Sequence, residues 1–535
     1  MTGGGISRGA GRHFSVSRRD FLKTIAVGGA AVGGVSALGS QLAGWNSLAG
    51  ASSPKRGGDL TFARLADPET IDPSAAIDTE SIWTVLCLYD CLYDVTQSGH
   101  SEIPWLATGY ELSSDQLTWT FHLRSGVKFS DGRPLDSADV KFSFERALKG
   151  PNAYILAAVD AIDTPNTSTV VIHTSHPWGP LPGDMSMYSN AVLPNELRGM
   201  TDAEFFDHPI GTGPFVMESW TKGEQMLLKR NPYYWQEGKP YLDSVTFLTV
   251  PDDNTRLVEL KGGNVDIMEA PPYSSVAGLQ STPGVVVNLF KSSAVSSFGM
   301  SEKKAPFKDV HVRRAISYAV DRKSIIDDVL FGHGTPAASF FSPAWPYYYA
   351  DTPKLWYDPD TAKKEIAMSA YPKGFSTTYA VAAGDEINGT IAQIVQANLK
   401  VIGIDVAIQS YDPSTLAALV AVGNYDMSPA IGTLDISDPD ENVPAAVGEA
   451  YGGIYDAYTW YQNPELLKLV HQSENTIATS ERAKIYNEIQ TLTAEACPFV
   501  MLYYSPFPYA EQTTVEGFDI PPTGAYHLEK VWLSS

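Results

Sequence analysis

The sequence predicts an α/β protein built from two lobes, and three observations support this fold class. The 535 residues exceed what one hydrophobic core accommodates and suffice for two or three domains. Hydrophobic residues make up 44% of the chain and aromatic residues 11%, as in packed globular proteins. After the first fifty residues, strand-like alternation and helix-like periodicity follow one another along the chain, which is typical of α/β architectures.

The N-terminal segment, residues 1–51, is predicted to be a twin-arginine export signal. Arg18 and Arg19 stand in "SRRDFLK", a Gly/Ala-rich apolar run follows, and the small-residue pattern "AGA" closes it at 49–51. No cysteine lies near that pattern, so a lipid anchor is not expected. We therefore expect an exported protein that is periplasmic or at the cell surface, either released or held by an uncleaved signal.

Charge and cysteine usage exclude several classes of protein. The formal net charge is −23, and segment 1–51 is itself basic, so the remainder of the chain is still more acidic. Such a surface repels phosphate backbones, so nucleic acid is not an expected partner. Cys87, Cys91 and Cys497 are too few for a disulfide scaffold, and Cys87 and Cys91 are expected to be small core residues. We expect no cofactor and no metal site.

The first lobe is predicted to begin with a strand at "GDLTFARL", residues 58–65, followed by a helix over about 78–93. A further helix is expected over "SADVKFSFERAL", residues 137–148. Asp136 is a suitable N-cap for it, with Asp139 at the third helical position in place of the usual Glu.

The second lobe is predicted to contain an amphipathic helix near residue 312. Apolar residues recur there at helical spacing: Val312, Ala315, Ile316, Ala319 and Val320. Arg313 and Arg314 fall outside this apolar stripe, so their charges are expected to be solvated.

The acidic stretch "DISDPDENVPAAVGE", residues 435–449, has the ligand spacing of an EF-hand calcium loop, with Asp438, Asp440, Asn442 and Glu449 at positions 1, 3, 5 and 12. The sixth position, which needs a Gly for the sharp turn, carries Val443 instead. The flanking sequence also predicts a strand and a loop. We therefore interpret the match as accidental.

Longer stretches resemble the family 5 extracellular solute-binding proteins, the peptide, nickel and opine receptors of ABC importers. The similarity runs through "LTWTFHLRSGVKFSDGRPLDSADVKFSFERAL", "PIGTGPFVMESWTKGEQMLLKRNPYYW" and "APFKDVHVRRAISYAVDRKSII" and covers residues 57–510 in the family's order. The resemblance implies a bilobal periplasmic-binding-protein-like fold of type II with an extra subdomain in the first lobe. It divides the chain into a lobe I start at 52–90, the extra subdomain at 91–205, lobe I at 206–300, lobe II at 301–500 and a return to lobe I at 501–535.

The resemblance also implies a function and a site. A monomeric receptor of this kind traps a small solute between its lobes and delivers it to a membrane permease and its ATPases. Peptide receptors of the family bind the ligand's amino group with an Asp that precedes an acid-Pro pair, which places that role on Asp435 in "GTLDISDPDEN", with Gly432 where the family often has Trp. Dipeptide receptors also use an Arg for the ligand's carboxylate, but the corresponding stretch here holds Asp385 and Glu386.

The missing Arg leaves the ligand class open. A longer peptide with its carboxylate in water, an oligosaccharide or another non-peptide solute all remain compatible. Aromatic side chains that would stack on a sugar are available in "SPAWPYYYA" and "YDAYTWYQNP". The candidate ligand-binding residues are therefore Asp435, Trp345, Tyr458 and Trp460, with Glu69 added from "DPETIDPS".

Two rival functions are less well supported. A nickel site would have to use His173 and His176, but positions three apart on a strand point to opposite faces. A secreted hydrolase is a second rival, yet the chain lacks a Gly-x-Ser-x-Gly elbow, a phosphate loop and a dinucleotide fingerprint. We therefore expect a binding protein and not an enzyme.

Overall fold

The computed structural model describes residues 53–447 and 459–534, which belong to the second of two compact units, Met1–Ser52 and Ser53–Ser535. The predicted twin-arginine segment lies outside the described residues. Within the described part of the chain, no helix is both long and apolar enough to cross a membrane.

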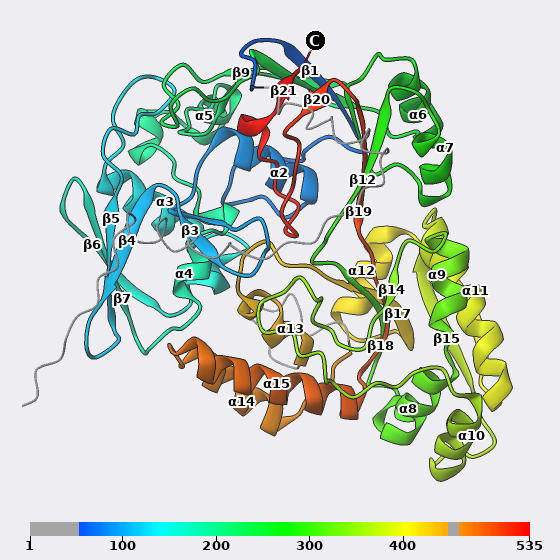
Figure 1. Cartoon of the computed structure of the whole chain (residues 1–535). Helices are drawn as coiled ribbons and strands as arrows, with labels where there is room; N and C mark the ends of the chain where they lie inside the picture. Colours follow the sequence, from blue (N-terminus) through cyan, green and yellow to red (C-terminus); the bar gives the residue numbers. More distant parts are fainter. Residues whose placement is uncertain (1–52, 448–458, 535) are drawn as a thin grey trace, which may run out of the picture. The chain divides into compact units, whose positions relative to one another are not determined.

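The first sheet has seven strands in the order β12-β19-β11-β1-β10-β9-β8 (Figure 1). Strand β1 pairs in parallel with β10 and β11, and the other neighbours are antiparallel. We call this sheet, its helices and the subdomain described next lobe I. Its strands are β1 (Asp59–Arg64), β8 (Phe215–Thr221), β9 (Gln225–Arg230), β10 (Ser244–Thr249), β11 (Ile267–Glu269), β12 (Val285–Phe290) and β19 (Phe507–Gln512).

The helices of lobe I begin where the sequence supplies caps. Helix α2 (Thr79–Leu88) starts at Asp78, whose carboxylate accepts from the Ser81 amide at 2.9 Å, and it ends before the predicted residue 93 because Tyr89 is extended. Cys87 and Cys91 are buried and free, as predicted. The other helices here are α5 (Asp202–Asp207), α6 (Asp253–Lys261) and α7 (Val276–Gln280).

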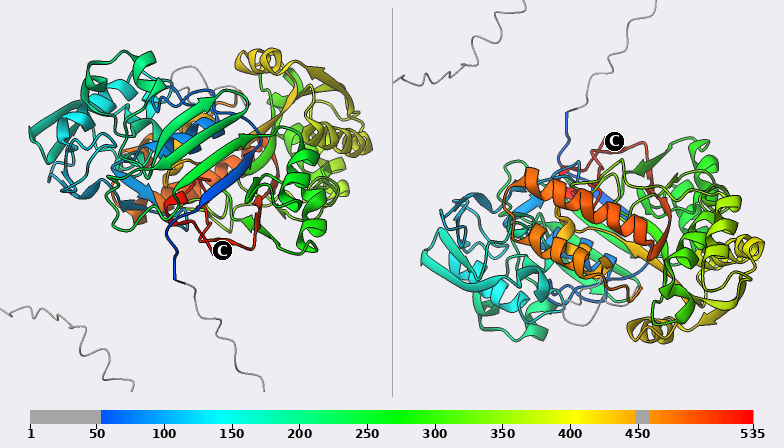
Figure 2. Two further views of the ribbon diagram at one scale, coloured as in Figure 1. Left: turned by 90° about the horizontal axis from the view of Figure 1, so that it is seen from above. Right: turned by 90° about the horizontal axis from the view of Figure 1, so that it is seen from below.

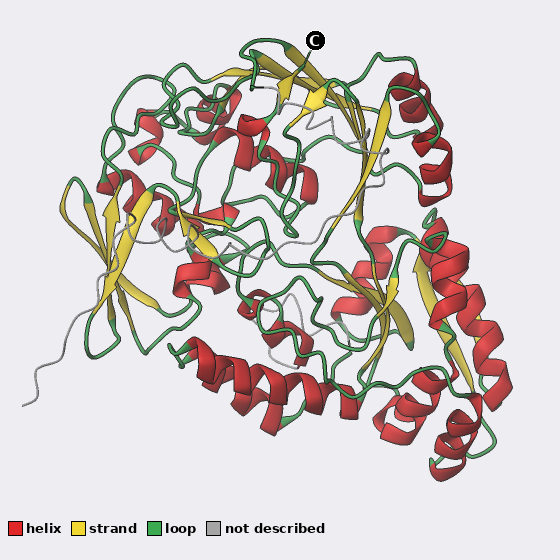
Figure 3. Cartoon of the chain, in the orientation of Figure 1, coloured by secondary structure: helices red, strands yellow, loops and turns green. Residues whose placement is uncertain are grey.

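The extra subdomain contains a four-stranded antiparallel sheet in the order β4-β5-β7-β6 (Figure 3). A separate core of buried side chains, among them Trp119, Phe121 and Phe144, lies within it. Its elements are β2 (Tyr93–Val95), β3 (Glu102–Pro104), β4 (Ala107–Leu112), β5 (Thr118–Leu123), α3 (Ser137–Ala147), η1 (Ala153–Leu156), β6 (Val159–Asn166), β7 (Thr169–Thr174), α4 (Leu181–Asp184), η2 (Tyr188–Asn190) and η3 (Asn195–Gly199).

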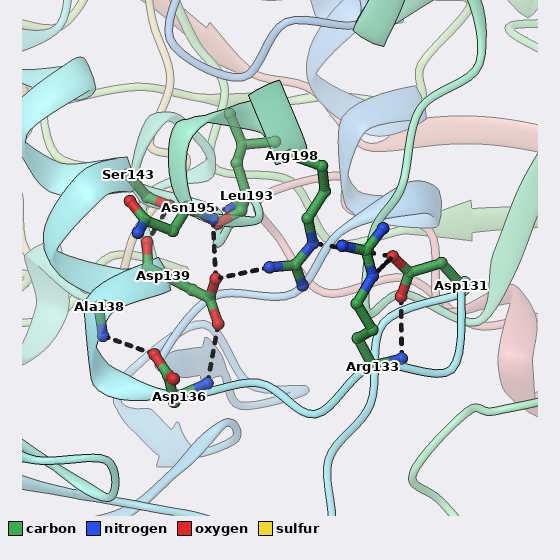
Figure 4. A network of polar contacts seen from close by, with 9 residues as sticks. All are labelled: Asp131, Arg133, Asp136, Ala138, Asp139, Ser143, Leu193, Asn195 and Arg198. Atoms are coloured by element: carbon green, nitrogen blue, oxygen red, sulfur yellow. Dashed lines mark hydrogen bonds and ion pairs between the residues drawn. The ribbon is translucent and has the colours of Figure 1, made fainter. Parts of the chain in front are cut away.

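The predicted cap of α3 is confirmed (Figure 4). Asp136 accepts from the Ala138 amide at 2.8 Å, and Asp139 accepts from the Asp136 amide at 2.8 Å. The other oxygen of Asp139 accepts from the Asn195 amide at 2.7 Å. This anchors η3, in which Glu196, Leu197 and Arg198 have positive φ angles of 50°, 49° and 59°.

The second sheet has six strands in the order β14-β18-β13-β17-β15-β16 and forms lobe II with the helices around it. Its strands are β13 (Val295–Met300), β14 (Thr335–Pro336), β15 (Ser376–Ala382), β16 (Asp405–Tyr411), β17 (Met427–Gly432) and β18 (Phe499–Tyr504). Its helices are α8 (Val310–Ala319), α9 (Arg322–Val329), α10 (Pro359–Met368), α11 (Glu386–Leu399), α12 (Pro413–Ala421), α13 (Val443–Val447), α14 (Pro464–Glu474) and α15 (Thr479–Ala496). Helices α14 and α15 lie side by side below the sheets (Figure 2).

The expectation of solvated charges on the helix near residue 312 is wrong for Arg313. The helix forms as α8, but Arg313 is only 4% exposed. Its guanidinium donates to the carbonyl oxygens of Ala496 at 2.9 Å and Phe307 at 2.7 Å, and Nη1 lies 2.7 Å from Glu302. These partners satisfy the buried charge, which helical periodicity alone does not reveal.

The chain passes between the two sheets twice. It crosses first between β12 and β13, at residues 291–294, and returns between β18 and β19, at residues 505–506. The two crossings touch, because the Ser292 hydroxyl donates to the Ser505 carbonyl. Both differ from the predicted boundaries at 300 and 501, since β13 and β18 pair with each other in lobe II.

Candidate functional site

A cavity of about 350 Å³ lies between the two lobes, next to the crossings. Lobe I contributes residues from α2, η1 and η2, lobe II contributes the end of β17 and the loop after it, and the crossings contribute Ala294 and the start of β19. Its described lining is Ile77, Thr79, Ile82, Trp83, Asn152, Tyr154, Met187, Tyr188, Ala294, Ile431, Thr433, Asp435, Glu441, Asn442, Phe507 and Thr523.

The described lining is apolar and aromatic over much of its surface, with a concentrated negative charge at one place. Asp435 and Glu441 are its only charged residues, and no described Lys, Arg or His lines it. An apolar cavity with a few polar groups is the usual form of a small-molecule site. This one can stabilise a positively charged group by charge-assisted hydrogen bonds.

The loop that carries Asp435 is held by contacts with Ser293 and Arg482 and by a cap within the loop. Ser293, in the first crossing, accepts from the Leu434 amide at 3.0 Å. Asp438 caps the short helix η7 (Pro439–Glu441). Both of its carboxylate oxygens also pair with the buried guanidinium of Arg482 in α15, and Nη2 of Arg482 donates to Oδ1 at 2.8 Å. The loop is therefore a fixed support for the Asp435 side chain.

Glu441 closes this loop on itself. Its Oε2 accepts from the backbone amide of Asp435 at 2.8 Å and from that of Ile436 at 3.2 Å. Burial raises the pKa of Asp435, while a hydrogen bond with the Glu441 side chain acts in the opposite direction. Burial also raises the pKa of Glu441 well above its usual value, and the neighbouring Asp435 charge raises it further. Burial and the nearness of the other carboxyl group therefore both make ionisation of Glu441 less favourable.

A second, smaller cavity of about 40 Å³ adjoins the first, and Asp435 and Thr523 line both. The Thr523 side chain is buried, with 7% of the residue exposed, and its hydroxyl has no hydrogen-bond partner among the described residues. A buried hydroxyl without a partner is costly, so a bound molecule at this position would satisfy it.

The structure brings only Asp435 of the predicted site residues into the interlobe cavity, among those it describes. Trp345 is 1% exposed, donates from Nε1 to the Ser293 carbonyl at 2.7 Å, and lies against Gly432. It supports the first crossing and borders a small neighbouring cavity. Tyr458 lies outside the described residues.

The other two predicted residues lie elsewhere. The Trp460 ring is covered by the Lys303 ammonium, 3.2 Å from its centroid, near the start of β17, whereas Asp435 follows that strand's end. Glu69 is exposed in the loop between β1 and α2 and does not line the cavity. The two tryptophans predicted from the aromatic clusters therefore do not line the interlobe cavity.

The acidic residues with calcium-loop spacing have other partners. Asp438 pairs with Arg482, and the segment follows a strand and not a helix. Glu449 lies outside the described residues.

The two histidines considered for nickel have separate partners. His173 lies in β7 and contacts Asp163 at 3.2 Å, while His176 contacts the Ser175 hydroxyl at 2.8 Å.

Sequence reasoning missed Glu441 and Thr523. It considered the acids after Asp435 as an accidental calcium-loop match, and the structure shows Asp438 as the N-cap of η7. Glu441 comes close to Asp435 because the Asp435 and Ile436 amides donate to its side chain, a contact that no periodic pattern encodes. The acid six residues after Asp435 was the only available signal. Thr523 lies in a loop far along the chain, and no pattern in the sequence indicated it.

Comparisons with known proteins agree with this arrangement. A family model described as bacterial extracellular solute-binding proteins, family 5 middle, matches residues 102–453. The oligopeptide-binding protein AppA of Bacillus subtilis (strain 168) is 28% identical over 525 residues, covering 93% of this chain and 95% of AppA. The structure of AppA with a nonapeptide has a TM-score of 0.76 at 27% identity, covering 90% of this chain and 100% of that chain.

Two further structures are similar. The periplasmic binding protein DppA from Helicobacter pylori, in complex with the peptide STSA, has a TM-score of 0.77 at 26% identity over 90% of this chain and 99% of that chain. AgaA from A. tumefaciens R10, in complex with agropinic acid, has a TM-score of 0.77 at 27% identity over 89% of this chain and 99% of that chain. The predicted bilobal α/β fold is confirmed.

Proposed function

Because the chain belongs to the bacterial extracellular solute-binding proteins of family 5, we propose that it is the substrate-binding receptor of an ABC importer and that its ligand is a short oligopeptide. AppA is named an oligopeptide-binding protein, and DppA was solved with a bound peptide. The family consists of solute-binding proteins, which supports binding without turnover.

The observation that carries this proposal is the charge of the interlobe cavity. Its described lining has two carboxyl groups, on Asp435 and Glu441, and no cationic side chain. A peptide's N-terminal ammonium suits such a place, whereas a ligand carboxylate would be repelled. A volume of about 350 Å³ lies near the lower end of the range for ligand pockets, which supports a short peptide.

The proposal includes transport partners and a route. The receptor closes its lobes about the crossings near Ser292 and Ser505, and the closed form docks on a membrane permease whose ATPases drive import. We propose that it acts as a monomer outside the cytoplasmic membrane. Residues 1–51 would direct its export by the twin-arginine route.

The test is native mass spectrometry of the protein purified without refolding, followed by calorimetry with a panel of alanine peptides of two to five residues. Asp435→Asn should weaken peptide binding by roughly 1.5–3 kcal/mol, because it removes a charge-assisted hydrogen bond. Asp360→Asn, an exposed acid at the start of α10, is the control and should bind as the unaltered protein does. Equal affinity of Asp435→Asn would remove this residue from the site.

A non-peptide solute is the second candidate, because the similar structure of AgaA contains agropinic acid. An oligosaccharide belongs to the same alternative. Retention of a sugar or other non-peptide mass, together with no binding by the alanine peptides, would favour it. Turnover of a bound peptide or sugar would instead support a hydrolase and contradict the receptor proposal.

A further inference from the structure

We propose that a cavity inside lobe II binds a single halide ion, such as chloride, between Arg322 and Thr493. This cavity of about 30 Å³ lies where α8 packs against β18 and α15 (Figure 1), and we call it the Arg322 cavity. The polar residues of its described lining are Ser317, Arg322, Ser339, Gln490, Thr493 and Cys497. None of them lines the interlobe cavity, so this site is separate from the one proposed for the peptide.

Arg322 is a buried cation, 5% exposed, whose hydrogen-bond partners in the described part of the chain are all neutral. Its guanidinium donates to the Met501 carbonyl at 2.6 Å, to the Ser317 carbonyl and hydroxyl at 3.0 Å and 2.9 Å, and to the Val320 carbonyl at 3.2 Å. The adjacent acid, Asp321, directs its carboxylate to the first amides of α9. Burial lowers the pKa of Arg322 to about 10, so these groups compensate the charge only in part.

Two hydrogen-bond donors at this cavity are left for a bound ion. A guanidinium has five N–H groups, and the four bonds of Arg322 leave one of them. Thr493 is 3% exposed and lines the same cavity, and its hydroxyl has no hydrogen-bond partner among the described residues. The Gln490 side chain, by contrast, has partners at both its oxygen and its nitrogen. A buried hydroxyl without a partner is costly, and an anion would accept from it and from Arg322 together.

The Cys497 thiol indicates the sign of the potential at this cavity, which it lines. Burial raises the pKa of the thiol, and the positive charges of three arginines act in the opposite direction. These are Arg313, Arg322 and Arg314. No acidic side chain is among the described residues that line the cavity. The whole chain carries a net charge of −23, but an anion at this place would be attracted by the nearest charges.

The volume of the cavity selects the kind of anion. One water molecule needs roughly 10–15 Å³ of such a cavity. A volume of about 30 Å³ therefore suits a monatomic ion, whereas phosphate or an organic acid is too large. The bound ion would join α9 to α15 beside β18, the strand that pairs with β13 in the lobe II sheet. Halide binding should therefore stabilise the folded chain, because the site does not exist in the unfolded one.

The experiment is scanning calorimetry of the full protein without peptide, with sodium gluconate replaced stepwise by sodium chloride or bromide. Gluconate is too large for the cavity, and a constant ionic strength keeps the screening of surface charges equal. We expect the melting temperature to rise with the halide concentration, following the binding of one ion to the folded form. Crystals of the full protein soaked in bromide should show an anomalous peak between the Arg322 guanidinium and the Thr493 hydroxyl.

Two variants and one control test the role of the hydroxyl. Thr493→Val keeps the shape of the side chain without the donor, so halide affinity should fall by about tenfold or more. Its melting temperature in gluconate should be no lower than that of the unaltered protein, since a hydroxyl without a partner is removed. Thr493→Ser keeps the donor and should keep the halide dependence. Ser189→Ala is the matched control, because Ser189 also has a buried hydroxyl without a described partner but does not line the Arg322 cavity; its halide dependence should be that of the unaltered protein.

Three results would overturn the inference: a melting temperature that does not depend on the halide, an undiminished halide effect in Thr493→Val, or a bromide peak only outside this cavity. Each of them leaves the receptor proposal standing, because the Arg322 cavity and the interlobe cavity have no described lining residue in common. If Thr493→Val does not fold, the halide titration and the bromide position in the unaltered protein decide.

Discussion

Gly179 lies at the place where lobe I meets the helical layer of lobe II, and no side chain fits there. It follows β7, and its amide donates to the Glu474 carbonyl at the end of α14 at 2.7 Å. A Cβ at this position would lie 2.2 Å from the Thr476 carbonyl oxygen and 3.2 Å from the Arg482 Cδ. Gly179→Ala therefore tests whether this contact holds the lobes together.

The expected size of the effect follows from these distances. An ordinary contact with the Thr476 oxygen requires a displacement of about 1 Å. The same movement stretches the hydrogen bond to Glu474 beyond its normal range, so the bond is lost. Losing it and leaving a buried amide unpaired costs about 1–3 kcal/mol in the closed form. In the closure proposed above, the described arrangement is the closed form and the open form lacks this contact, so peptide affinity should fall roughly 5- to 150-fold.

The assay is calorimetry with the tightest-binding alanine peptide, supported by small-angle scattering with and without that peptide. Gly278→Ala is the matched control, since a Cβ on this residue of α7 meets nothing within 4 Å. It should bind peptide as the unaltered protein does. Full affinity and full compaction in Gly179→Ala would refute the reasoning, as would an equal loss in Gly278→Ala.

Two further predictions concern stability. Glu196→Gly should raise the free energy of unfolding by up to about 1 kcal/mol, because glycine tolerates its positive φ, whereas Glu145→Gly within α3 should lower it by about 1 kcal/mol; urea denaturation that ranks them otherwise would contradict this. Burial raises the pKa of Glu511 to about 7, the Asn288 amide acting in the opposite direction. Its protonated form therefore adds stability that is fully present below the ordinary pKa of 4.5 and is lost as pH rises through 7, by about 3 kcal/mol at most. In thermal melts Glu511→Gln should gain on the unaltered protein across that pH range, and a constant difference would exclude the assignment.

Local patterns predicted much of the secondary structure. The alternation of "GDLTFARL" predicted β1, and Asp136 with Asp139 predicted the start of α3, because caps and alternation involve residues close in the chain. The resemblance predicted Asp435 as a ligand-binding residue through a short motif, and in the structure this residue lines the interlobe cavity.

Contacts between segments that are far apart in the sequence could not be predicted from these local patterns. Arg313 is buried because carbonyls of Phe307 and Ala496 surround it, and the second of these is far along the chain. The positions of Trp345 and Trp460 likewise depend on which strands pair. The chain's crossings follow from β13 pairing with β18, which involves segments on either side of lobe II.

The sequence by itself therefore determined the α/β class and the family, and it predicted Asp435 as a candidate site residue. Only the tertiary structure decided which groups join that acid. The Glu441 side chain accepts a hydrogen bond from the Asp435 amide, and Thr523, in a loop near the C-terminal end, lines the same small cavity as Asp435. The physical reason is that helix capping and strand alternation involve residues close in the sequence, whereas a cavity forms where segments far apart in the sequence pack together.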